Sequence, residues 1–146
     1  MAHDEEQASI YDVLVEETRI DDVVVTTSFA PTLLCVPATI DVAAVEIELI
    51  NAAERESRLH HALDEYLESR ATEGLPRLDY VFIDCPPSLG LMTINAFVAA
   101  NEVLIPMQAE YYALEGLALL TRSVERVAQT HNSSLTVSMI CLLYTS

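Results

Sequence analysis

Apolar residues in the second half of the chain fall into two kinds of pattern. Short, continuous apolar runs at 80–83 and 103–105, and the mainly apolar stretch 135–143, predict strands. Between these runs, the stretches 91–100 and 112–130 predict helices. Strands that are apolar throughout are typical of a parallel sheet with both faces covered. The order of elements therefore predicts an α/β fold, with a three-layer, mainly parallel sheet flanked by helices.

The first half of the chain is less regular. Ser9 is placed to cap a short helix, and Asp41 is placed to cap another. Apolar runs at 23–25 and 33–36 predict strands, and the spacing of the apolar residues over 57–69 predicts a further helix.

The composition fits a folded protein of the cytoplasm. Hydrophobic residues make up 51% of the 146 residues, which argues against disorder, and this length suits one domain over 1–146. No run of about 18 apolar residues predicts a membrane span, and the acidic start lacks the features of a signal peptide. We therefore expect a cytoplasmic protein that does not engage a membrane.

The charge and the glycine content argue against two kinds of phosphate binding: to the phosphates of nucleic acid, and to a nucleotide through a glycine-rich loop. The net charge of −16, from 7 basic and 23 acidic residues, would repel nucleic acid. The chain has 3 glycines, where about ten are usual, and it has no lysine. A phosphate-binding loop of the form G-x-x-x-x-G-K-[ST] needs both residue types close together. The sequence therefore contains no such loop.

Cysteine and histidine do not suggest a metal site. Cys35, Cys85 and Cys141 are far apart and have apolar neighbours, so they are predicted to be buried free thiols. His60 and His61 are adjacent and lack the i, i+4 spacing of a zinc pair on a helix.

The first candidate site follows the apolar run 80–83. Asp84 ends that run, and open parallel sheets bind ligands at the carboxyl ends of their strands. Two interpretations stay open: the carboxylate supports the Mg²⁺ of a nucleotide, directly or through water, or it caps the loop through backbone hydrogen bonds. Pro86 and Pro87 stiffen the turn that follows, and Ser88 is placed to cap the next helix.

The second candidate site follows the run 103–105. The polar residues Gln108, Glu110 and Tyr111 gather where a strand gives way to a helix. Glu110 is either a functional group or a favourable charge in the first helical turn, and the tyrosine either binds a ligand or packs.

Several segments of the chain, taken in sequence order, resemble ParA/Soj-type partition ATPases. They read LDYVFIDCPPSLG at 78–90, TINA at 93–96 and PMQAEYYALEGL at 106–117. The upstream segments 9–14 and 36–41 match the same family in order. Because several motifs occur in the family's order, the resemblance is far more specific than one apolar run ending in aspartate.

The resemblance implies a P-loop NTPase-like fold and a parent ATPase for chromosome or plasmid partitioning. Such proteins bind ATP and Mg²⁺, form ATP-bound homodimers and bind DNA non-specifically in that state. A ParB-like partner stimulates their hydrolysis of ATP, and the parent is expected to associate with the nucleoid.

The resemblance also assigns cofactor-binding residues by position. Asp84 matches the Walker B aspartate that supports Mg²⁺, directly or through water. The residues that match the switch-like loop, and the segment near the nucleotide and the dimer face, are Pro86, Pro87, Ser88, Gly90, Gln108, Glu110 and Tyr111.

Parts of the family pattern have no counterpart in this chain. They are the P-loop, the aspartate that positions the attacking water, and the downstream half with its adenine contacts and basic DNA-binding surface. We therefore expect a reading frame truncated at both ends, without a complete catalytic set and without bound ATP or Mg²⁺ of its own. A parallel sheet without its neighbouring strands has unpaired edges, so we also expect the isolated chain to aggregate or to fold poorly.

Two other hypotheses stay open. The chain is a non-catalytic module that binds a partner protein if its coding sequence truly starts at Met1, with no glycine-rich loop upstream. It belongs to a MinD-like division-site ATPase if a C-terminal amphipathic membrane helix follows. The Asp84-Cys85-Pro86-Pro87-Ser88 segment fits the partition branch better.

Overall fold

A computed structural model describes residues 8–108 and 113–143 of the chain. The chain divides into two compact units, Met1–Phe82 and Ile83–Ser146. Each unit has its own hydrophobic cluster, so each is described by itself.

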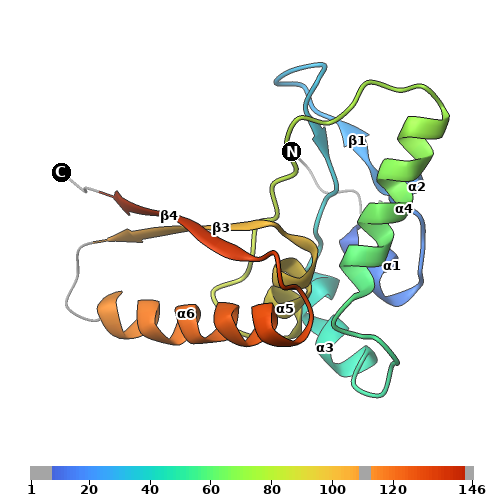
Figure 1. The fold of residues 1–146 in the computed structure, drawn as a ribbon. Coiled ribbons are helices and arrows are strands. Elements are labelled where there is room, and N and C mark those ends of the chain that lie inside the picture. The colour runs from blue at the N-terminus through green and yellow to red at the C-terminus, as the bar shows by residue number, and fades with distance from the viewer. Residues whose placement is uncertain (1–7, 109–112, 144–146) are drawn as a thin grey trace. The chain divides into compact units, whose positions relative to one another are not determined.

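The first unit is mainly helical (Figure 1). Its elements are α1 (Ile10–Val15), α2 (Ile20–Val23), β1 (Val25–Thr26), β2 (Leu34–Cys35), the 3-10 helix η1 (Ile40–Ala44), α3 (Val45–Glu48) and α4 (Arg58–Thr72). The two short strands pair antiparallel, with Val25 opposite Cys35. The predicted run at 23–25 therefore divides between two elements, because Val23 ends α2 with its side chain buried while Val25 begins β1.

Helix α1 begins at the residue that the sequence predicts. The Ser9 hydroxyl oxygen accepts a hydrogen bond from the Tyr11 backbone N–H at 3.2 Å. The Asp12 carboxylate in turn accepts from the Ser9 backbone N–H at 2.6 Å, which completes a reciprocal cap. The Ser9 cap is confirmed. The second predicted cap is wrong: Thr39 caps η1 by accepting from the Asp41 N–H, so Asp41 lies inside the first turn.

Helix α4 packs on α1 and α2 and spans three residues more at its C-terminal end than the predicted 57–69. Tyr66 lies in a buried cluster with Val13, Ile20 and Val23. The Tyr66 hydroxyl also accepts a hydrogen bond from Arg70 at 3.2 Å, which holds its polar end. One face of α4 thus closes the core of the first unit, while its acidic face is solvated.

The second unit is a parallel strand pair with helices. Its elements are α5 (Leu91–Ala99), β3 (Glu102–Gln108), α6 (Ala113–Thr130) and β4 (Thr136–Leu143). Strands β3 and β4 lie side by side in parallel, and α6 is the crossover that connects them (Figure 1). The predicted strands and helices of this region are confirmed to within a few residues at their ends.

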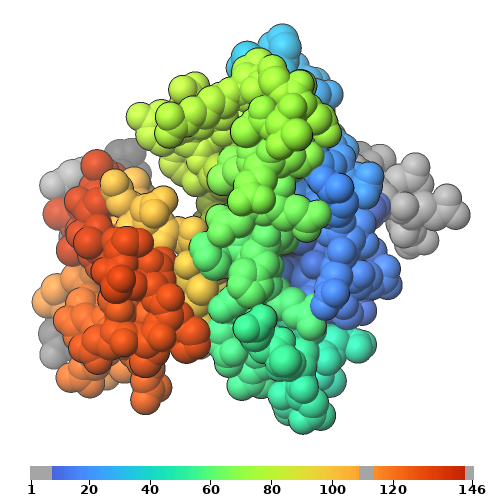
Figure 2. All heavy atoms as spheres, turned by 45° about the vertical axis from the view of Figure 1, so that its right-hand side comes forward, coloured from blue at the N-terminus to red at the C-terminus, as the bar shows by residue number. Residues whose placement is uncertain are grey.

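Side chains of β3 alternate between a covered and an open face. Ile105 is buried, whereas Leu104 and its register partner Met139 are each 54% exposed. The covered face carries a cluster formed by Phe97 and Val98 of α5 with Val124 and Val127 of α6. Helix α6 and strand β4 lie directly against each other, as Figure 2 shows on the face in view. The candidate-site residues at the end of β3 therefore belong to a strand that is covered on one face by packed helices.

The apolar run at 80–83 is not a strand, which corrects the prediction. Its backbone pairs with no strand among the described residues, and Tyr80 and Phe82 are 81% and 88% exposed. An apolar run becomes a buried strand only when neighbouring strands satisfy its backbone and helices cover its side chains. The described residues supply neither.

The cysteines also differ from the prediction. Cys35 and Cys85 are exposed and Cys141 is partly exposed, and all three are free thiols. Apolar neighbours in sequence indicated burial, but β2 has only two residues and the segment around Cys85 is open, so these neighbours do not enclose the sulfur atoms.

Candidate functional site

The first candidate site is a loop that runs from Asp84 to Gly90, where α5 begins. Asp84, Pro86, Pro87 and Ser88 are all exposed, and Gly90 is partly buried. Gly90 takes the N-cap position of α5 with an extended backbone, at φ −87° and ψ −168°. The five site residues predicted in this segment thus lie together on one solvent-facing turn.

Ser88 does not cap α5, which corrects the prediction. No side chain caps this helix, and Gly90 occupies the position before its first turn. The Ser88 contribution is its backbone carbonyl, which accepts a hydrogen bond from the Thr93 hydroxyl at 2.6 Å. The loop is therefore held by the Thr93 side chain of α5 and not by the side chain of Ser88.

Two polar residues of α5, the helix that follows the loop, are buried. Thr93 is 3% exposed and Asn95 is fully buried, and the Asn95 amide donates to the Leu91 carbonyl at 3.1 Å. The sequence interpretation placed both in a family-like segment but gave neither a role. The signal that could have found Thr93 is a hydroxyl residue in the first turn of a mainly apolar helix.

Cys85 lies beside Asp84 and has a perturbed thiol. Desolvation by surrounding protein atoms raises the pKa of this thiol, and the negative charge of Asp84 raises that pKa further. The side chain as a whole is nevertheless exposed to solvent. At neutral pH the group is therefore a protonated, accessible thiol, which is a weak nucleophile.

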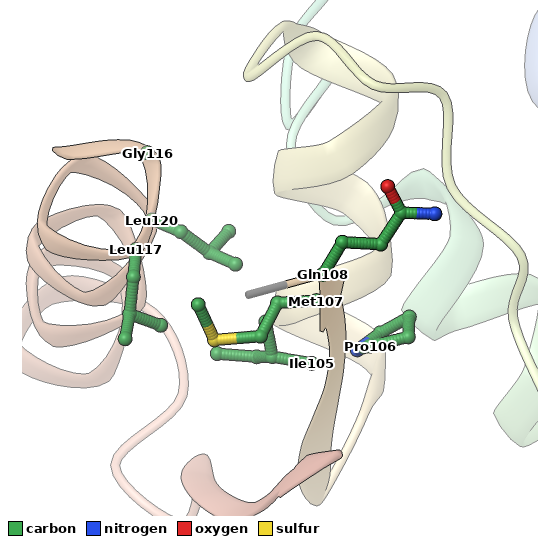
Figure 3. Close-up of a pocket in the computed structure, with 7 residues that line it drawn as sticks. All are labelled: Ile105, Pro106, Met107, Gln108, Gly116, Leu117 and Leu120. Carbon is green, nitrogen blue, oxygen red and sulfur yellow. The ribbon is translucent and has the colours of Figure 1, made fainter. Parts of the chain in front are cut away.

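The second candidate site is a hollow of about 330 Å³ between the end of β3 and the start of α6 (Figure 3). The residues that line it are Ile105, Pro106, Met107, Gln108, Gly116, Leu117 and Leu120. Figure 3 shows Met107 pointing toward Leu117, while the Gln108 amide points away from α6. The inside of the hollow is therefore apolar, with the amide at its rim.

The second group of predicted site residues is described only in part. Glu110 and Tyr111 lie outside the described residues, and Gln108 is exposed at the end of β3. Among the described residues, no hydrogen bond or ion pair connects Asp84 with Gln108.

Asp84 can bind Mg²⁺ as a single carboxylate ligand. In the ranges 8–108 and 113–143, no three His, Cys, Asp or Glu side chains gather closely enough to form a metal cage. Mg²⁺ keeps several water ligands, however, and commonly binds one or two carboxylates together with phosphate oxygens. The exposed carboxylate of Asp84 can serve as such a single ligand, directly or through water.

Comparison with protein families and curated proteins gives consistent matches. The model of the family described as "AAA domain" matches residues 1–137. The sporulation initiation inhibitor protein Soj of Bacillus subtilis is 42% identical over 133 residues, covering 91% of this chain and 49% of that protein. The chromosome partitioning protein ParA of Myxococcus xanthus is 45% identical over 134 residues, covering 92% and 44%. The chain spans about half the length of the curated relatives it matches.

Solved structures share the fold. Cobyrinic acid a,c-diamide synthase from Mycobacterium smegmatis superposes with a TM-score of 0.83 at 32% identity, over 99% of this chain and 56% of that one. The same enzyme with bound ADP and magnesium gives 0.78, over 95% and 52%. A plasmid partition protein from Borrelia burgdorferi gives 0.75 at 24% identity, over 97% and 53%, and supports the fold alone.

Within the part of the chain that the structure describes, no helix combines the length and apolar character needed to cross a membrane.

Proposed function

Because the chain belongs to the AAA-domain family and is of the ParA/Soj partition-ATPase type, we propose that it is the Asp84-bearing part of an ATPase for chromosome or plasmid partitioning. Its fold is the P-loop NTPase-like α/β fold that the resemblance predicts. The observation that carries the proposal is the loop from Asp84 to Gly90, which presents one accessible carboxylate on a turn stiffened by two prolines.

In this proposal Asp84 holds Mg²⁺ beside the phosphates of ATP, directly or through a water molecule. The bound ion neutralises charge on the phosphate oxygens during phosphoryl transfer. Pro86 and Pro87 limit the conformations of the turn, and Ser88 links it to α5 through its carbonyl. The resemblance assigns Gln108, Glu110 and Tyr111 to the segment near the nucleotide and the dimer face.

We further propose that residues 1–146 do not hydrolyse ATP by themselves. Phosphoryl transfer depends on a loop of backbone N–H groups and a lysine that surround the phosphates. This chain has no lysine, and its three glycines are scattered. The residues that position ATP would therefore have to come from other parts of the whole protein.

The whole protein is proposed to form an ATP-dependent homodimer, to bind DNA and to respond to a ParB-like protein on the nucleoid. With a net charge of −16, residues 1–146 are a poor surface for DNA. DNA contacts are therefore assigned to regions beyond these residues.

The test compares two proteins made from the same gene. One is the 146-residue chain, and the other is the reading frame extended into its flanking coding sequence. We expect Mg²⁺-dependent ATP turnover from the extended protein only, with a loss of at least about a hundredfold in Asp84→Ala. The matched control, Asp79→Ala, changes a nearby exposed aspartate and should retain turnover. Turnover by the 146-residue chain above its own Asp84→Ala variant contradicts the proposal, as does an extended protein with no glycine-rich loop.

A further inference from the structure

The hydrogen bond made by Thr93 differs from those of the other helical threonines described. Thr72, Thr121 and Thr130 each donate to the carbonyl four residues earlier, at 2.8–2.9 Å, within their own helices. Thr93 instead donates to the carbonyl of Ser88, five residues earlier and outside the helix, at 2.6 Å. Its hydroxyl therefore joins α5 to the loop, whereas each of the other three donates to a carbonyl of its own helix.

The helix that carries Thr93 is a firm base for such a link. Phe97 and Val98 are each 5% exposed and pack in the core of the second unit. At the other end of α5, the side-chain amide of Asn132 donates to the carbonyls of Phe97, Val98 and Ala100 at 2.9, 3.1 and 2.6 Å. The helix is thus fixed by packing and by hydrogen bonds at its C-terminal end.

The loop itself has few means of holding its conformation. Its side chains from Asp84 to Leu89 face solvent, so packing contributes little. Pro86 and Pro87 have no N–H group with which to form backbone hydrogen bonds. A buried hydroxyl that binds the Ser88 carbonyl is therefore placed to determine how the turn leaves the helix.

We propose that Thr93 is a positioning residue: its hydroxyl sets the conformation of the segment from Asp84 to Ser88, and thereby where the Asp84 carboxylate is presented. The consequence for Mg²⁺ and ATP rests on the proposed function. The conformational part does not, since it concerns residues of this chain alone.

Cys85 provides a direct probe of the segment. In a Cys35→Ser, Cys141→Ser background it is the single thiol, and its alkylation by iodoacetamide can be followed at a fixed pH. The Cys85 thiol donates to the Ile83 carbonyl at 3.8 Å within the segment, so a displaced segment should free the sulfur atom and speed its alkylation. The alkylation rate therefore reports the conformation of the segment rather than overall stability.

Three variants are compared in that background. Thr93→Val keeps the shape but removes the donor, Thr93→Ser keeps the hydroxyl, and Thr121→Val removes a bond of the ordinary helical kind on α6. We expect alkylation at pH 7.5 to be about fivefold faster in Thr93→Val, the effect of one lost hydrogen bond. Thr93→Ser and Thr121→Val should match the parent.

Unchanged Cys85 reactivity in Thr93→Val overturns the proposal, and so does an equal change in Thr121→Val. If Thr93→Val loses its circular dichroism signal, Thr93→Ala is compared with Thr93→Ser instead. Equal Cys85 reactivity in these two variants then overturns the proposal. The assay contains no nucleotide, so a negative result leaves the ATPase proposal standing. Absence of ATP turnover in the extended protein would, conversely, leave the alkylation result intact.

Discussion

The side-chain amide of Asn132 donates a hydrogen bond of 2.6 Å to the carbonyl of Ala100, which lies 32 positions earlier in the chain. The same amide reaches the carbonyls of Phe97 and Val98, and its oxygen accepts from the hydroxyl of Ser134 at 2.7 Å. One side chain thus caps the end of α5 and orders the turn before β4. This connects the layer beneath the Asp84 loop to the parallel strand pair.

Replacing Asn132 should destabilise the second unit. Asn132→Ala leaves carbonyls at the end of α5 without their donor, so we expect a loss of about 1–3 kcal/mol in the free energy of unfolding. Urea denaturation followed by circular dichroism measures it. Asn51→Ala, at an exposed asparagine in the first unit, is the matched control and should change stability by less than about 0.5 kcal/mol. Equal effects from the two variants would refute this role of Asn132.

The Ser9 cap should contribute measurably to the first unit. Ser9→Ala removes the acceptor for the Tyr11 N–H and one partner of Asp12, so we expect a loss of about 1 kcal/mol. Thermal unfolding compared with Ser28→Ala, at an exposed serine in a bend, separates the cap from a general serine effect. A melting temperature unchanged by Ser9→Ala argues that α1 forms without its cap.

Glu54 should gain stability when replaced by glycine. Its backbone has a φ of +51°, where a side chain is strained and glycine is not. We expect Glu54→Gly to stabilise the chain by up to about 1 kcal/mol. Ala53→Gly, next to it without a positive φ, should instead destabilise because glycine has more freedom in the unfolded chain. A loss of stability in Glu54→Gly would show that its side chain contributes more than the strain costs.

The reactivity of Cys85 should depend on pH in a defined direction. Its thiol has a pKa above the ordinary value, so it should react at higher pH than the same cysteine in urea-unfolded chain. Asp84→Asn should shift the alkylation profile to lower pH but not fully to the unfolded value, because desolvation is the larger cause. Asp79→Asn is the control. A profile unaffected by Asp84→Asn would remove Asp84 as a cause.

By linkage, the raised thiol pKa contributes stability only while the thiol is protonated. That stability is fully present below the unfolded pKa and is lost as pH rises through the folded pKa.

The sequence predicts the second unit well and the first unit less well, for a physical reason. Runs such as 103–105 and 135–143 form strands because β3 and β4 pair with each other locally, across the single crossover helix α6. The run at 80–83 has equal apolar character but finds no partner strand among the described residues. Strand formation depends on that partner, and the composition of one segment does not encode it.

The candidate site shows the same limit. Sequence places Asp84, Pro86, Pro87, Ser88 and Gly90 on one loop because they are neighbours, and the structure agrees. The sequence wrongly predicts that Ser88 caps α5, because serine before a helix is among the commonest caps. The link through Thr93 was missed because it depends on how the turn folds back over the helix, which local pattern does not specify.

The most direct test of the central claim measures how Mg²⁺ and Asp84 depend on each other in nucleotide binding. ATP affinity of the extended protein is measured with Mg²⁺ and with EDTA, for the parent, for Asp84→Asn and for the control Asp79→Asn. If Asp84 supports the ion, removing Mg²⁺ weakens ATP binding by at least about tenfold in the parent and control but has little effect in Asp84→Asn. An equal loss on Mg²⁺ removal in all three proteins would contradict the account.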